Sequence, residues 1–282
     1  MQPLPKKCNH HLISHIRSII CPSRRNENRT SSSTMRQAIF SNPNDAAEYL
    51  ANYIIAKINA STKPFVLGLP TGSSPEGIYA KLIEAYKQGR VSFKNVVTFN
   101  MDEYLGLAPS DLQSYHYFMY DKLFNHIDIP RENIHILNGL AKNIDEECAS
   151  YERKIKQYGK IDLFLGGLGP EGHLAFNEAG SSRDSKTRKV ELVESTIKAN
   201  CRFFDNDESK VPKYALSVGI STILDNSQEI AIIVLGKNKQ FALDKTINGK
   251  PNDPKYPSSY LQDHANVLIV CDHAAAGLKS KL

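Results

Sequence analysis

The amino-acid sequence predicts an α/β fold in which helices cover both faces of a mostly parallel sheet. Three observations predict it. Strand-like and helix-like segments alternate along residues 35–282. The strand-like runs are continuously apolar, which is typical of strands that are buried on both faces. Several of these runs end at glycines, where the backbone can turn sharply. Neither an internal repeat nor a Gly/Ser linker divides this region, so we expect one domain.

The first half of this region contains four predicted strands, Gln37–Phe40, Pro64–Leu69, Val96–Asn100 and Ile134–Leu137. Asn42 can cap the first helix with Pro43 at its first position. The apolar residues of this helix recur at helical spacing at Ala47, Leu50, Ile54 and Ile58. The further helices are expected at Pro75–Lys87, at Asp111–His126, and along the stripe Cys148, Tyr151, Ile155 and Tyr158, which Gly159 closes.

The second half continues the same alternation. Leu163–Leu165 is a short apolar strand that precedes a glycine cluster. After a polar stretch follow the strands Ala215–Val218 and Ile230–Leu235, a helix near Lys239–Ile247, and the strand Val267–Cys271. Because a crossover between parallel strands is right-handed and needs a covering helix, this order favours a parallel sheet with helices on both sides.

Residues 1–34 differ in kind from the rest. Of the chain's 35 basic and 30 acidic residues, six and one lie in this segment, which leaves 29 of each in residues 35–282. The net charge of +5 therefore belongs to the N-terminal segment, and the neutral body gives no indication of nucleic-acid binding. We expect this basic, Ser-rich extension to be a disordered tail or a stretch upstream of the true start, for example Met35. A mitochondrial-type targeting segment is the alternative.

The cysteines and the hydropathy indicate a cytoplasmic protein. The chain has five widely spaced cysteines and no C-x-x-C pair, which argues against a disulfide framework and favours a reducing compartment. No apolar run approaches the roughly 18 residues that span a bilayer, so we expect no membrane partner.

The segment D-L-F-L-G-G-L-G-P-E-G-H-L-A-F-N-E, residues 162–178, carries the clearest chemical signal. A strand stops at glycines, and Glu171, His173 and Glu178 follow. Ligands of open α/β sheets bind beyond the carboxyl ends of strands. A His between acids at such a place can transfer protons. A His held by local hydrogen bonds alone is the simpler alternative.

Two other strand ends carry polar groups. In V-L-G-L-P-T-G-S-S-P, Ser73 and Ser74 precede a helix, whose free N–H groups favour an anion such as phosphate. In V-V-T-F-N-M-D-E-Y, Asp102 and Glu103 follow a strand, and since neighbours in extended chain point to opposite sides, only one should face a site. An ordinary turn and a helix-capping acid are the alternatives.

Two cations lie next to other apolar segments: Arg202 precedes Phe203–Phe204, and Lys239 follows Val234–Gly236. Each could bind phosphate or could be a solvated surface charge. We expect no metal, because Glu171 and His173 are the only close pair of ligand types. We also expect no dinucleotide cofactor, because the glycines lack the G-x-G-x-x-G spacing. Together these features indicate acid–base chemistry on an anionic small molecule.

These motifs closely resemble the glucosamine-6-phosphate deaminase (isomerising) family. The resemblance extends from about Met35 to near the C-terminus, through the segments L-G-L-P-T-G-S-S-P, V-T-F-N-M-D-E-Y, G-H-L-A-F-N-E, S-R-D-S-K-T-R and N-C-R-F-F-D-N-D. It implies a modified doubly wound, Rossmann-like fold. The implied reaction converts glucosamine-6-phosphate and water to fructose-6-phosphate and ammonia, as in catabolism of N-acetylglucosamine, without metal or redox cofactor.

The resemblance also implies roles for single residues. Asp102 would be the base that moves the C2 proton, and His173 would open the sugar ring with help from Glu171 and Glu178. The phosphate would be bound by Ser73, Ser74, Arg202 and Lys239. These roles fit the chemistry, because one carboxylate can move a proton between neighbouring carbons and a bound phosphate positions them.

The chain departs from the family pattern at two places. Glu171 stands where the family usually has Asp, and the extra methylene predicts reduced turnover, since a misplacement of about 1 Å can cost on the order of 10²-fold in rate. Ser181 and Arg188 match the effector site of allosteric bacterial members, but Val190 replaces a lysine there, and the chain ends soon after its last strand. We therefore expect hyperbolic kinetics without activation by N-acetylglucosamine-6-phosphate, and a homo-oligomer, if any, smaller than the family's hexamer.

Two other functions remain open. A phosphogluconolactonase-type hydrolase shares this fold and a similar G-H loop, but needs no base at Asp102. A weakly active sugar-phosphate sensor would bind the substrate without turnover. Release of ammonia distinguishes the deaminase from both.

Overall fold

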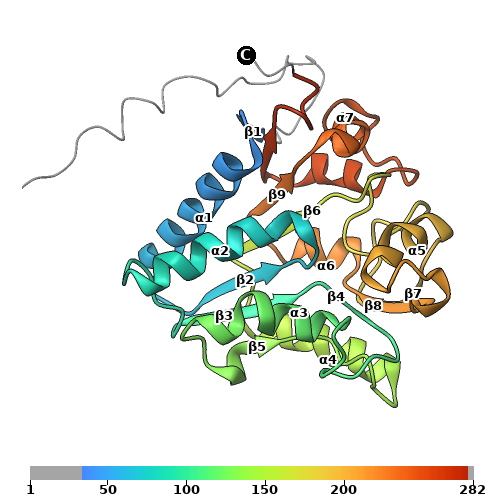
Figure 1. Cartoon of the computed structure of the whole chain (residues 1–282), viewed down its shortest axis with the longest axis horizontal. Coiled ribbons are helices and arrows are strands. Elements are labelled where there is room, and N and C mark those ends of the chain that lie inside the picture. The colour runs from blue at the N-terminus through green and yellow to red at the C-terminus, as the bar shows by residue number, and fades with distance from the viewer. Residues whose placement is uncertain (1–33, 279–282) are drawn as a thin grey trace, which may run out of the picture.

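The computed structural model describes residues 34–278, so the expectations for the N-terminal extension lie outside the described residues, apart from Thr34, where β1 begins. A seven-stranded parallel sheet forms its centre, in the order β1-β10-β9-β6-β2-β3-β5 (Figure 1). Its strands are β1 (Thr34–Phe40), β2 (Phe65–Leu69), β3 (Val96–Asn100), β5 (Ile134–His135), β6 (Leu163–Gly167), β9 (Ile230–Val234) and β10 (Asn266–Asp272).

Helices cover both faces of this sheet. The helices α1 (Pro43–Ala60), α2 (Ser73–Lys87) and α3 (Tyr115–Lys122) contribute to one apolar core, and α4 (Ile144–Gln157), α6 (Ile220–Asp225) and α7 (Gln240–Asn248) contribute to the other. Side chains alternate between the two cores along β9: Ile230, Ile232 and Val234 join the second, and Ala231 and Ile233 the first. The predicted parallel sheet with helices on both faces is confirmed.

A second sheet, which the sequence did not indicate, has three antiparallel strands in the order β4-β8-β7. They are β4 (Asp102–Tyr104), β8 (Tyr214–Ser217) and β7 (Arg188–Glu191), with α5 (Glu194–Asn200) beside them (Figure 1). The predicted strand Ala215–Val218 is therefore β8 and lies outside the parallel sheet. Asp102 is paired with Ser217, which ties the end of β3 to a segment more than a hundred residues later.

The predicted helix Asp111–His126 is shorter in the structure, where α3 spans Tyr115–Lys122. Ser114 caps it, since its hydroxyl oxygen accepts a hydrogen bond from the N–H of Tyr117 at 3.0 Å. A 3-10 turn at Phe124–His126 follows. The helix thus begins about one turn later than the sequence predicted.

Candidate active site

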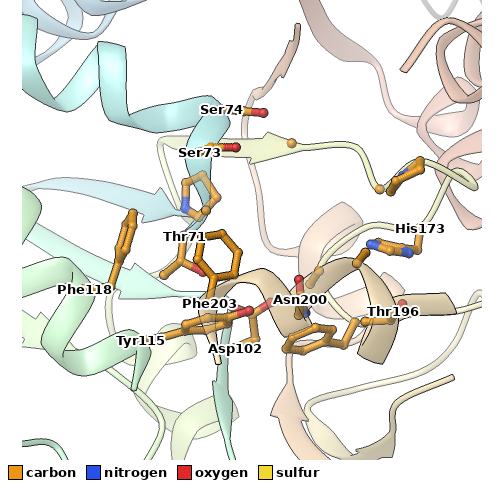
Figure 2. A pocket seen from close by; sticks show the side chains of 18 of the residues that line it. Thr71, Ser73, Ser74, Asp102, Tyr115, Phe118, His173, Thr196, Asn200 and Phe203 are labelled. Atoms are coloured by element: carbon orange, nitrogen blue, oxygen red, sulfur yellow. The ribbon is translucent and has the colours of Figure 1, made fainter. Parts of the chain in front are cut away.

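A cavity of about 490 Å³ lies beyond the carboxyl ends of β2, β3, β6 and β9. Figure 2 shows side chains from different elements around this space, with Ser73 at the start of α2, Asp102 after β3 and His173 in the loop after β6. Seven of the eight residues predicted for the site line the cavity: Ser73, Ser74, Asp102, Glu171, His173, Arg202 and Lys239. The eighth, Glu178, contacts His173 by a hydrogen bond.

The start of α2 forms one wall. Gly72 precedes the helix with a φ of 92°, a left-handed conformation that favours glycine, and no side chain caps the helix there. The first N–H groups of α2 therefore keep their hydrogen-bonding capacity, and the helix dipole adds positive potential. With the hydroxyls of Ser73 and Ser74, which line the cavity, this end of α2 is suited to a phosphate group.

Asp102 lies on another wall and is only 5% exposed. Its Oδ1 atom is buried and has no hydrogen-bond partner among residues 34–278. Burial, with a further contribution from the charge of Glu103, raises the pKa of the Asp102 carboxyl well above its usual value. A carboxylate with an elevated pKa and an unused oxygen is a stronger base than one in water.

Glu103 points to the other side of β4 and caps α3. Its Oε1 accepts hydrogen bonds from the N–H of Tyr104 at 2.8 Å and of Tyr115 at 2.9 Å, and its Oε2 accepts one from His116 at 2.8 Å. Burial raises the pKa of Glu103 to about 7, although these three N–H groups act in the opposite direction. Of the two neighbouring acids, only Asp102 lines the cavity.

The loop after β6 holds His173 against its own backbone. A Cβ atom at Gly169 would come within 2.0 Å of the His173 Nε2 atom, so only glycine fits this position. The Gly169 N–H also donates to the His173 carbonyl at 3.0 Å. One glycine of the cluster after β6, Gly169, therefore allows the close packing of the imidazole.

Glu178 is the acid that contacts the imidazole. Its Oε2 lies 3.1 Å from His173 Nδ1, and the two side chains are 11% and 18% exposed. Burial alone would raise the pKa of Glu178, but the hydrogen bond and charge of His173 and a hydrogen bond from Thr196 hold it below its usual value. Glu171, in contrast, is exposed and accepts a hydrogen bond from Ser195 Oγ at 3.2 Å. The carboxylate next to His173 is thus Glu178.

Two cations complete the lining. Lys239 Nζ donates to the Leu168 carbonyl at 2.6 Å, which holds the ammonium at the end of β6. Burial, and secondarily the charge of Arg202, lowers the pKa of Lys239 to about 8. Two positive groups that repel each other at one cavity can both be stabilised by a phosphate dianion.

The cavity also contains a row of hydroxyl and amide groups that was not predicted from the sequence. The Tyr115 hydroxyl donates a hydrogen bond to the Tyr104 hydroxyl at 3.3 Å. Asn200 Nδ2 donates one to the same Tyr104 oxygen at 3.0 Å. All three residues line the cavity. The Tyr after Asp102 and Glu103 was the only available signal, because α5, which carries Asn200, shows no apolar periodicity.

The strand β8 contacts both β4, which carries Asp102, and the loop that carries His173. It does not line the cavity itself. Ser217 is paired with Asp102, and its Oγ accepts a hydrogen bond from the Phe176 N–H at 3.0 Å. The next carbonyl, of Val218, accepts from Asn177 Nδ2 at 2.8 Å. The loop of His173 is therefore attached to the strand that also holds Asp102.

Within residues 34–278, no group of three or more His, Cys, Asp and Glu side chains is arranged to hold a metal ion. Helices long and apolar enough to cross a bilayer are also missing from this part of the chain.

The family model of glucosamine-6-phosphate isomerases/6-phosphogluconolactonase matches residues 41–270. The chain belongs to this family. It is 94% identical to a glucosamine-6-phosphate isomerase of Candida albicans over 248 residues. These aligned residues cover 88% of this chain and 100% of that protein. It is 54% identical to a glucosamine-6-phosphate deaminase of Glaesserella parasuis serovar 5, over 83% of this chain and 90% of that protein.

Solved structures have the same fold as this chain. A monomeric glucosamine-6-phosphate deaminase superposes with a TM-score of 0.83 and 38% identity, over 87% of this chain and all of that one. A 6-phosphogluconolactonase from Leishmania guyanensis shares the fold, with a TM-score of 0.65 and 20% identity, over 85% of this chain and 97% of that one. The resemblance inferred from the motifs is confirmed.

Proposed function

We propose that this protein converts glucosamine-6-phosphate and water to fructose-6-phosphate and ammonia. One observation carries the proposal: Asp102, a buried carboxylate with one oxygen that has no hydrogen-bond partner among residues 34–278, lines the same cavity as His173, which Glu178 contacts. A lactonase needs no base to remove hydrogen from carbon, whereas an aldose–ketose shift requires one. The relatives at 94% and 54% identity, named an isomerase and a deaminase, support the same reaction.

The proposed sequence begins with ring opening. His173 accepts the proton of the C1 hydroxyl and delivers it to the ring oxygen as the C1–O bond to that oxygen breaks, while Glu178 stabilises the imidazolium formed in between. Asp102 then takes the C2 proton while the C1 aldehyde oxygen gains a proton, which gives an enolamine. Asp102 returns its proton at C1 and the amine nitrogen loses one, so that the C1 oxygen ends as a hydroxyl. This leaves an imine at C2, which water hydrolyses to the ketone and ammonia.

The phosphate would lie between the start of α2 and the two cations. Ser73 and Ser74 offer hydroxyls there, and Arg202 and Lys239 offer charge. Because the phosphate does not react, its binding energy serves to position C1 and C2 between Asp102 and His173.

Ammonia release by the purified full chain tests the proposal, with Asp102→Asn as the control of low activity. Steady ammonia production from glucosamine-6-phosphate, lowered by roughly 10²- to 10⁴-fold in the variant, is the expected result. Hydrolysis of 6-phosphogluconolactone without ammonia release would instead identify a lactonase. Tight substrate binding without any turnover would identify a sensor.

The affinity for substrate is expected to fall as pH rises through about 8, the pKa of Lys239. Above that pH the ammonium loses its proton and one phosphate-binding charge disappears, while the phosphate itself stays dianionic because its second pKa is about 6. We expect KM to rise roughly tenfold between pH 7.5 and 9.5. In Lys239→Met, KM should be high and nearly constant over this range, and a variant with the wild-type pH profile would contradict the assignment.

Glu171→Asp tests the length of the acid at this position. The Glu171 carboxylate contacts Ser195 in the structure, while Glu178 contacts His173. If the longer side chain limits its assistance to His173, the shorter one should raise kcat several-fold, within the roughly 10²-fold that a 1 Å displacement can cost. The measurement is kcat of both chains under saturating substrate. An unchanged or lower kcat in Glu171→Asp would show that the longer side chain does not limit turnover.

We further propose that N-acetylglucosamine-6-phosphate does not activate the enzyme. Arg188 is engaged with Asn177 Oδ1 at 2.8 Å and Ser181 Oγ at 3.2 Å, and Val190 packs in an apolar cluster where an effector phosphate would need a cation. The rate should depend hyperbolically on substrate concentration with or without this compound. A sigmoidal curve that becomes hyperbolic on its addition would refute this. The similar deaminase of known structure is monomeric, so we expect an assembly smaller than a hexamer.

A further inference from the structure

The short helix α5 contacts residues near both His173 and Asp102. Thr196 and Asn200 are four residues apart in this helix and therefore share one of its faces. Thr196 Oγ1 donates a hydrogen bond to Glu178 Oε1 at 2.5 Å, and Asn200 Nδ2 donates to the Tyr104 hydroxyl at 3.0 Å. Figure 2 shows Asn200 between Asp102 and His173, and Thr196 below His173.

The orientation of the Glu178 carboxylate depends on two hydrogen bonds. Oε2 contacts His173 Nδ1 and Oε1 accepts from Thr196. The last torsion of a Glu side chain has a broad energy minimum, so one contact does not fix the plane of the carboxylate. Thr196 is 5% exposed, and water has little access to replace its hydroxyl.

The backbones on both sides are held by other contacts. The Glu178 carbonyl accepts a hydrogen bond from the Ser181 N–H at 3.0 Å, and the Gly180 N–H donates to the Pro254 carbonyl at 2.7 Å. The Thr196 N–H donates to the Val193 carbonyl at 3.0 Å. The Thr196 hydroxyl is therefore not required to hold either chain segment in place, and its contact is with the carboxylate.

We propose that Thr196 is a positioning residue, which holds the Glu178 carboxylate in the plane that orients His173 for ring opening. The inference rests on the proposed deaminase function and adds a residue to it. Removing the hydroxyl would leave a buried carboxylate oxygen without a partner and free the carboxylate to rotate away from the imidazole. The loss should affect ring opening and spare the binding of a substrate analogue that has no ring to open.

The test compares Thr196→Val, which has nearly the same shape without the hydroxyl, with Thr196→Ser, which keeps the hydroxyl. Ammonia release and the inhibition constant of the acyclic analogue 2-amino-2-deoxyglucitol 6-phosphate are measured for each. The loss of a hydrogen bond to a charged group predicts a kcat lowered by roughly 10- to 100-fold in Thr196→Val, with the inhibition constant unchanged. Thr196→Ser should restore most of kcat. Glu194→Gln, an exposed position of the same helix, is the control that should behave as wild type.

A double-mutant cycle shows whether Thr196 acts through Glu178. In a Glu178→Gln background, Thr196→Val should lower kcat less than about threefold further. Full additivity, an unchanged kcat in Thr196→Val, or an equal loss of inhibitor binding would each overturn the inference and leave the proposed function intact. A wild-type chain that releases no ammonia would overturn both. If Thr196→Val does not fold, Thr196→Ala takes its place in the same comparisons.

Discussion

Asp102→Asn is expected to lower kcat for ammonia release by roughly 10²- to 10⁴-fold, the usual contribution of a general base. The amide is nearly isosteric with the carboxylate but cannot take the C2 proton. Exchange of the C2 proton with deuterated solvent should be lost to the same degree. The control is Asp244→Asn, an exposed carboxylate of α7, which should leave both rates unchanged. A variant that keeps more than a tenth of the wild-type kcat would disprove the role of Asp102.

The same substitution should stabilise the fold. Since burial raises the pKa of Asp102, the unfolded chain loses this proton at a lower pH than the folded one. Folding stability is therefore lost as pH rises from the unfolded value toward the folded one. Asn carries no charge, so Asp102→Asn should melt at a higher temperature than wild type at pH 8. The difference should vanish near pH 3, where the carboxyl is protonated in both states. Thermal unfolding at the two pH values measures this.

His173→Gln should also reduce kcat by roughly 10²- to 10⁴-fold, because the glutamine amide cannot accept and return a proton during ring opening. The Gly169 N–H donates to the His173 carbonyl at 3.0 Å, and because the substitution keeps this backbone contact, the shape of the loop should be retained. Binding of the acyclic amino-alditol phosphate should stay within about twofold of wild type.

The matched control for this variant is His126→Gln, an exposed histidine whose ring makes a hydrogen bond with the Asp121 carbonyl at 2.8 Å. It should leave kcat unchanged. If His173→Gln loses inhibitor binding together with kcat, the imidazole serves binding more than ring opening. If it retains most of kcat, the proposed role of the His173–Glu178 pair is wrong.

Much of the fold was predictable because its signals are local. The strands of the parallel sheet are short, continuously apolar runs, and β9 alternates its side chains between two cores. The start of α1 followed from Asn42, whose side chain accepts from the Asp45 N–H, with Pro43 after it. The second sheet was not predictable. β4 has three residues and β7 is largely charged, and both become strands only by pairing with β8 far along the chain.

The candidate site divides in the same way. Asp102, His173 and the serines at α2 follow strand ends, so their place at one edge of the sheet follows from topology. The partners of these groups could not be predicted. Glu171 and Glu178 are both near His173 in sequence, and only the turn of the loop, with Gly172 at a φ of 90°, decides which carboxylate reaches the imidazole. Thr196 and Asn200 come from a helix with no recognisable pattern.

The pairing of β8 with Asp102 and with the His173 loop has a consequence for how this enzyme can change. Asp102 and His173, the side chains of the proposed chemistry, take their spacing from one strand that does not line the cavity. A deletion or insertion of a single residue in 214–218 would invert its alternation and move the two groups relative to each other. We therefore expect new sugar preferences to arise by replacement of lining side chains such as Leu112 or Phe203, and the length of β8 to stay constant if the proposed roles of Asp102 and His173 hold.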